Sequence, residues 1–201
     1  PAEIRWIWLS HTDADHIGNL GRILEIAPQA QVVTSMLGAA KIGLLAAADP
    51  ARLHVLGPDD VFTAGTRRFH QVKPAYYDAP EAMGFFESRD RMLFTVDSFG
   101  ALLPTVIREV EAMTEATLRE GMIAWSCIDA PWLGQVDGAA FGATLNALAA
   151  LEPAAVLSGH LPVTRDLARL TGIIAGAWGA GGSNAVPQAA AAQVRALLEA
   201  A

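Results

Sequence analysis

The sequence predicts an α/β domain in which short strands alternate with amphipathic helices. Short apolar or β-branched runs at 31–35 and 155–157 predict strands, and apolar residues at helical spacing predict helices at 20–26 and 141–151. Alternation of this kind is typical of α/β proteins. The 201 residues, of which 52% are hydrophobic, suffice for a sizeable core, and the length suggests one domain.

In chain order, the patterns predict strands at 4–9 (mostly buried), 31–35, 54–56, 61–62 and 67–72, two strands joined by a polar turn within 85–96, and a buried strand at 155–157. They predict helices at 20–26, 39–48, 104–120, 141–151 and 167–178. A glycine-rich linker follows at 179–184, and Pro187 then opens an alanine-rich helix. We therefore expect a main domain over 1–184 and a C-terminal helix within 185–201.

Composition excludes several classes of function. A net charge of −7 argues against nucleic-acid binding, which requires a basic face. No apolar run approaches the roughly 20 residues of a membrane span, and the N-terminus lacks the layout of a signal peptide, so a soluble, cytoplasmic protein is expected. Cys127 is the single cysteine and has no activating neighbour, which predicts a buried structural thiol.

The most informative stretch is 10–20, directly after the first predicted strand. It places four metal-binding residue types within six positions: His11, Asp13, Asp15 and His16. The carboxylates in so tight a turn would repel unless a cation or hydrogen-bond donors lay between them. A polar loop, or a helix start at which Asp13 and Asp15 favour the dipole, is the alternative. The density of ligand types favours a metal site.

This stretch resembles the His-x-His-x-Asp-His signature of the metallo-β-lactamase fold, with Asp13 in place of the second His. Flavodiiron proteins and the related diiron oxygen-binding proteins also have a carboxylate, Glu, at the position of Asp13, so the stretch resembles theirs. The resemblance implies a metallo-β-lactamase-like αββα sandwich. In that fold several strands precede the motif, whereas only residues 1–9 precede it here. We therefore expect these strands to come from a preceding segment or from another copy in a homo-oligomer.

Three later segments resemble the same family, in the same order and at similar intervals. Residues 77–83 resemble the segment in which a metal-binding His precedes an aromatic residue, Pro, Asp, Ser and Met, and Asp78 falls on that His. Residues 92–100 resemble the strand that leads to a bridging Asp, which is Asp97 here. Residues 158–160 resemble the last ligand loop, which ends in His160.

Each of these residues also has an ordinary structural interpretation. Asp78 is a common turn residue before Ala-Pro, Asp97 could cap a turn or helix, and His160 could lie in an exposed loop. His54 and His70 match no family position and are predicted to be non-ligands, with His70 a reserve candidate. Trp132 resembles a family segment near the site entrance, and a core aromatic is the alternative.

The resemblance implies two metal ions and no catalytic side chain beyond their ligands. Metal one would be bound by His11, Asp13, Asp78 and Asp97. Metal two would be bound by Asp15, His16, Asp97 and His160. Taken together, this carboxylate-rich set favours iron, or manganese, over zinc. A single ion at metal two is the alternative, because Asp13 and Asp78 are shorter than the family's Glu and His. We expect His11, Asp15, His16, Asp97 and His160 to converge at one sheet edge.

Three functions remain open. The first is a diiron protein that binds or reduces dioxygen, nitric oxide or peroxide. It would require a separate redox partner, because no FMN-binding flavodoxin-like domain follows Asn184 in this sequence. The second is a metal-dependent hydrolase of a small-molecule ester, lactone, thioester or phosphoester. The third is a metal-poor protein that acts by binding.

Overall fold

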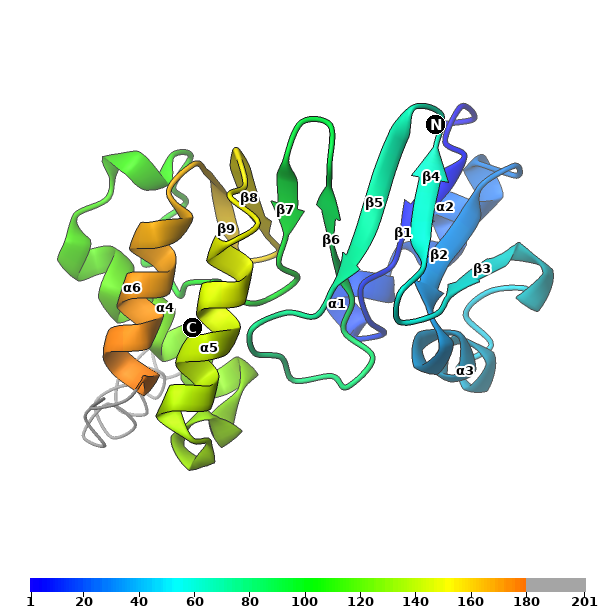
Figure 1. The fold of residues 1–201 in the computed structure, drawn as a ribbon. Helices are drawn as coiled ribbons and strands as arrows, with labels where there is room; N and C mark the ends of the chain where they lie inside the picture. Colours follow the sequence, from blue (N-terminus) through cyan, green and yellow to red (C-terminus); the bar gives the residue numbers. More distant parts are fainter. Residues whose placement is uncertain (180–201) are drawn as a thin grey trace. The chain divides into compact units, whose positions relative to one another are not determined.

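The computed structural model describes residues 1–179, which fold as two compact units (Figure 1). Unit 1 comprises Pro1–Lys73 and Ala79–Arg89, and unit 2 comprises Pro74–Asp78 and, among the described residues, 90–179. The chain thus crosses from one unit to the other three times. Both units mix helices and strands, so the predicted α/β class is confirmed.

One sheet of unit 1 is parallel, in the order β1-β2-β3. Its strands are β1 (Trp6–Trp8), β2 (Gln31–Ser35) and β3 (Leu53–Leu56). The connecting helices are α1 (Ala14–Ile17), α2 (Leu20–Ile26) and α3 (Met36–Leu44), and a 3₁₀ turn, Pro50–Arg52, precedes β3. Leu9, Leu20, Leu24, Val32 and Ile42 pack together as a buried core around β2, the central strand. The loop that carries His11 therefore begins on a well-packed base.

Three further strands of unit 1 pair antiparallel, namely β4 (Val61–Ala64), β5 (Arg67–Val72) and β6 (Gly84–Glu87). Aromatic rings join these strands to β1. The Trp8 and Phe85 rings meet edge to face with centroids 5.1 Å apart, and the Phe69 and Phe85 rings do so at 5.2 Å. Edge-to-face pairs add to the stabilisation from burial alone.

Unit 2 contains β7 (Met92–Phe94), β8 (Ala155–Ser158) and β9 (Leu161–Thr164). Strand β7 pairs parallel to β8, and β8 pairs antiparallel to β9. Its helices are α4 (Glu115–Asp129), α5 (Gly138–Ala149) and α6 (Leu167–Trp178), with 3₁₀ turns at Val110–Ala112 and Pro131–Gln135. The Trp178 indole donates a hydrogen bond of 2.9 Å to the Ser126 hydroxyl, which joins α6 to α4.

The structure differs from the sequence predictions at several elements. The helix predicted at 104–120 is wrong, because α4 begins only at Glu115, where the Thr114 side chain accepts a hydrogen bond from Thr117 N. The helix predicted at 39–48 instead spans Met36–Leu44, since Ser35 caps its start. Strand β9 was not predicted, because Pro162 lies within it.

The first strand and Cys127 are less buried than predicted. Trp6 on β1 is 40% exposed, and Ile4 is 38% exposed. Cys127 is half-buried, and this burial raises the pKa of its thiol, which is consistent with an unreactive side chain. The predicted helix after Pro187 lies outside the described residues. No helix within residues 1–179 has the length and apolar character that a membrane crossing requires.

Candidate metal centre

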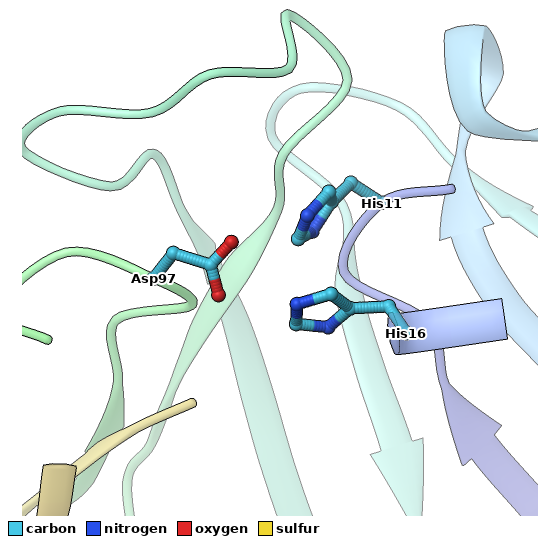
Figure 2. Close-up of side chains that lie close together, drawn as sticks. All are labelled: His11, His16 and Asp97. Carbon is cyan, nitrogen blue, oxygen red and sulfur yellow. The ribbon is translucent and has the colours of Figure 1, made fainter. Parts of the chain in front are cut away.

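Unit 1 contributes the first ligand set, which we define as His11, Asp13, Asp15 and His16. His11 lies in the loop after β1 and is fully buried, whereas His16 lies in α1 and is half-buried. Their rings lie side by side, with centroids 4.0 Å apart (Figure 2). The short turn between them brings the two imidazoles to one place although five positions separate them in sequence.

Ser10 contacts both imidazoles of this set. Its hydroxyl oxygen lies 3.1 Å from His11 Nδ1 and 3.4 Å from His16 Nδ1. A hydroxyl oxygen has two lone pairs and can therefore accept from both Nδ1–H groups. Those tautomers leave each Nε2 with a lone pair for a metal, and a metal-bound imidazole usually donates its other N–H in this way. The geometry thus fits two histidine ligands.

The two aspartates of the first set lie beside the imidazoles. Asp15 Oδ2 is 3.4 Å from His16 Nε2, and the Asp15 side chain is 59% exposed. Ligand atoms of His11 and Asp13 lie within 4.8 Å of one another. Asp13 occupies the N-cap position of α1 but makes no capping hydrogen bond there, so its carboxylate is not used by the helix. A carboxylate and an imidazole therefore lie near each other in two pairs.

Unit 2 contributes the second ligand set, defined as Asp78, Asp97 and His160. Asp97 Oδ1 lies 3.4 Å from His160 Nε2. Trp125 contacts both residues: its indole donates a hydrogen bond of 2.9 Å to the Asp97 carbonyl, and its ring centroid lies 4.1 Å from that of His160. A Cβ at Gly100 would lie 2.6 Å from Trp125 Nε1 and 2.9 Å from His160 Cβ, so any other residue there must displace this arrangement.

The backbone around Asp97 adopts an unusual conformation. Val96 has φ of 57° and Phe99 has φ of 65°, in the left-handed region that β-branched and bulky residues rarely occupy. Hydrogen bonds hold this loop: Gly159 N donates to Val96 O at 2.7 Å, and Gly100 N donates to Asp97 O at 3.0 Å. Such conformations persist only where surrounding contacts enforce them, and they concentrate at functional sites.

Tyr76 links the segment before Asp78 to the same loop. Its hydroxyl accepts a hydrogen bond of 2.6 Å from Phe99 N, and its carbonyl accepts one of 2.6 Å from the Ser98 hydroxyl. Tyr76 is completely buried, and this burial raises the pKa of its hydroxyl. The ring of Trp132 contacts Tyr77, and its indole donates to Tyr77 O at 2.9 Å. Trp132 therefore supports the segment that ends at Asp78.

Sequence reasoning missed Asp129, the last residue of α4. Oxygens of Asp78, Asp97 and Asp129 lie within 4.8 Å of one another, and the last two residues are buried. The motif resemblance gave no signal for Asp129. A weak signal was available, because an acidic residue at a helix C-terminus is disfavoured by the helix dipole. Carboxylates this close repel one another unless a proton or a cation offsets their charge.

The two remaining histidines lie elsewhere in unit 1. The His54 ring packs edge to face against Trp6 and Phe62, which is a structural role. His70 lies on β5 opposite Val61. Within residues 1–179, neither belongs to a group of three close ligand atoms. The prediction that the two ligand sets meet at one point joins residues of both units and stays a prediction.

Comparison with known proteins identifies the class. The sequence profile of the metallo-beta-lactamase superfamily matches residues 1–160, and the chain belongs to this superfamily. Its similar curated relatives include the flavo-diiron protein FprA2 of Clostridium acetobutylicum, which is 25% identical over 101 residues, covering 50% of this chain and 25% of that protein. The chain thus spans only a quarter of the length of this relative.

Solved structures confirm the metallo-β-lactamase fold. The rubredoxin oxygen:oxidoreductase of Desulfovibrio gigas superposes with a TM-score of 0.73 at 18% identity, over 87% of this chain and 43% of that one. A structure described as the peroxy diiron species of the chemotaxis sensor ODP gives a TM-score of 0.66 at 15% identity, over 93% of this chain and 76% of that one. The resemblance to flavodiiron proteins, first drawn from the motifs, is confirmed by these relatives.

Proposed function

We propose that this chain is a non-haem diiron domain that binds or reduces dioxygen, nitric oxide or peroxide. The observation that carries the proposal is the donor chemistry. In unit 1, one hydroxyl contacts two imidazoles, and in unit 2 an aspartate on a strained loop lies beside a histidine. The names of the relatives support iron, since they refer to flavo-diiron, oxygen oxidoreductase and peroxy diiron proteins.

The proposal assigns four residues of the chain to each ion. Metal one is bound by His11, Asp13, Asp78 and Asp97, and metal two by Asp15, His16, Asp97 and His160. Carboxylates outnumber imidazoles in this set, which suits iron or manganese better than tetrahedral zinc. The two ions supply the redox chemistry when bound. Electrons come from a donor domain or protein outside these residues.

The residues of the chain have separate tasks in this function. The Ser10 hydroxyl oxygen contacts both Nδ1 atoms and would accept from their N–H groups, so that His11 and His16 both present Nε2 to an ion. The hydrogen bonds around Asp97 hold its backbone, and the bridging position that we propose for its carboxylate requires such rigidity. The Trp125 ring against His160 restricts the orientations of that imidazole.

The test is anaerobic reconstitution with Fe²⁺, followed by elemental analysis and optical spectra before and after exposure to dioxygen or nitric oxide. We expect about two iron ions per chain, in keeping with a dinuclear site, and a visible band that changes on exposure. Zinc-loaded protein is the control, because Zn²⁺ has no redox chemistry and no d–d spectrum. If the visible spectrum of the iron-loaded protein changed with neither dioxygen nor nitric oxide, the proposal would be contradicted.

A second candidate, a metal-dependent hydrolase, is favoured by one feature of unit 1. An apolar hollow of about 290 Å³ lies beside the first ligand set and is lined by Thr12, Lys41, Leu44 and Leu45. A diatomic ligand has no need of such a surface, whereas the apolar part of an ester or thioester could occupy it. Hydrolysis of nitrophenyl esters of increasing chain length by zinc- or manganese-loaded protein, without any response to dioxygen, would favour this candidate.

Asp78→Ala tests whether metal one exists. If Asp78 is a ligand, the iron content should fall from about two ions to about one per chain, because metal two keeps all four of its ligands. Asp78→His should restore two ions and raise the zinc affinity of that site, since imidazole suits Zn²⁺. Metal content is measured on protein reconstituted under identical conditions. Unchanged stoichiometry in Asp78→Ala would show that Asp78 only shapes the turn before Pro80.

A further inference from the structure

Residues 81–83 bind the loop of the first ligand set at three points. The Trp8 indole donates to Met83 O at 2.9 Å, and Met83 N donates to Ser10 O at 3.0 Å. The Thr12 hydroxyl donates to Glu81 Oε1 at 2.9 Å. The first two bonds hold the chain before the loop. The third holds the loop itself, because Thr12 lies between His11 and Asp13.

Glu81 is an unusual residue to find at this place. Its side chain is completely buried, and its carboxylate accepts hydrogen bonds of 2.6 and 2.7 Å from Lys41 Nζ on α3. Its backbone carbonyl accepts a further bond of 3.2 Å from the Ser35 hydroxyl. A buried ion pair is generally no more stabilising than apolar residues of the same volume. Fold stability alone therefore gives little reason for a charge here.

The loop that contains Thr12 carries two negative charges that favour disorder when no metal is bound. Asp13 and Asp15 place two negative charges two positions apart in the chain, and Asp13 makes no side-chain cap to α1. If metal binding has to order the loop, the free energy spent on ordering lowers the affinity for the metal. A loop that is already held in place avoids this loss. The bond from Thr12 to a carboxylate that Lys41 holds rigidly supplies such a restraint.

We propose that Thr12, Glu81 and Lys41 form a positioning group that holds the first ligand set ready for metal. Thr12 is the contact to the loop, Glu81 is the acceptor, and Lys41 offsets the buried charge. None of the three binds an ion. This inference rests on the proposed function, because it concerns the affinity of that same site.

The experiment is titration of metal-free protein with Co²⁺, followed by its visible spectrum, for the wild type, Thr12→Val and Thr12→Ser. Valine keeps the shape of threonine and removes only the hydroxyl. We expect Thr12→Val to lose roughly 10- to 100-fold in Co²⁺ affinity, the usual effect of removing a partner that orients ligands. Thr12→Ser keeps the hydroxyl and should regain most of the affinity.

Ser35→Ala is the matched control. It removes the α3 cap and the bond to the Glu81 carbonyl but leaves the Thr12–Glu81 bond, so it should lower the unfolding midpoint and keep the Co²⁺ affinity. Equal affinities for the wild type and Thr12→Val would overturn the inference, and so would loss of affinity in Ser35→Ala to the same degree. Wild-type protein that binds no Co²⁺ would overturn the proposed function, and the inference with it.

Discussion

Asp97→Ala is expected to remove both metal ions while leaving a folded and more stable metal-free protein. If Asp97 bridges the two ions, as we propose, its loss should lower the stoichiometry from about two towards zero per chain. The metal-free protein should gain stability, since Asp97 lies among carboxylates of Asp78 and Asp129 and like charges destabilise one another. Elemental analysis and thermal unfolding with a chelator measure the two effects.

Asp129→Asn is the matched control for this result. It removes a charge from the same group of oxygens, but Asp129 corresponds to no ligand in the family resemblance. We expect a similar gain in the stability of the metal-free protein together with about two ions per chain. If Asp97→Ala still held two ions, Asp97 would not bridge them, and the assignment of both sites would fail.

Lys41→Met is expected to cause the largest loss of fold stability. It leaves the Glu81 carboxylate buried without its cation, and breaking a buried pair in this way costs roughly 3–5 kcal/mol. Lys41 is itself 36% exposed, so solvent screens part of the interaction and the lower end of about 3 kcal/mol is expected. Urea unfolding at pH 7 measures the difference. Replacing both residues with methionine should recover most of it, because no buried charge then remains.

The difference in stability between the wild type and Lys41→Met depends on pH, because it arises from the Lys41–Glu81 ion pair. Burial by itself raises the pKa of Glu81, but the hydrogen bonds from Lys41 and Thr12 outweigh it and hold the pKa below its ordinary value of 4.5. Because the pKa of Glu81 is lower in the folded than in the unfolded chain, its carboxylate stabilises the fold above pH 4.5. This stabilisation is lost as the pH falls through the folded-state pKa. In Lys41→Met burial dominates, so protonation of Glu81 relieves the destabilisation. The stability gap should therefore narrow on acidification, and a constant gap would contradict this account.

Much of the fold followed from local patterns. Helix α2, helix α6 and strands β2 and β5 have the predicted bounds, because each has a clear apolar period and a definite stop. The helix predicted at 104–120 was wrong because apolar spacing did not locate its start. Val106 lies within that range and is 96% exposed, whereas the side chain of Thr114 caps the true start of α4. Apolar residues at helical spacing indicated a helix, and only the cap located it.

Candidate ligands could be proposed from the sequence where they lie close together in the chain or match a family motif. His11 and His16 follow from one short stretch, and Asp97 and His160 follow from the resemblance. Residues that act through contacts distant in sequence were not predictable. Thr12 bonds to Glu81 across 69 positions, and Lys41 does so across 40. Asp129 matches no motif, and only folding brings it near Asp78 and Asp97.

The position of Trp125 allows its intrinsic fluorescence to report metal binding. Its indole touches the Asp97 carbonyl and its ring lies against His160, so an iron ion held by these residues would quench its fluorescence at short range. The other two indoles described in unit 2 donate to Ser126 and to the Tyr77 carbonyl and supply a background. Loading of the second ligand set can thus be followed by emission alone, without dye or label, and Trp125→Phe separates this signal from that background.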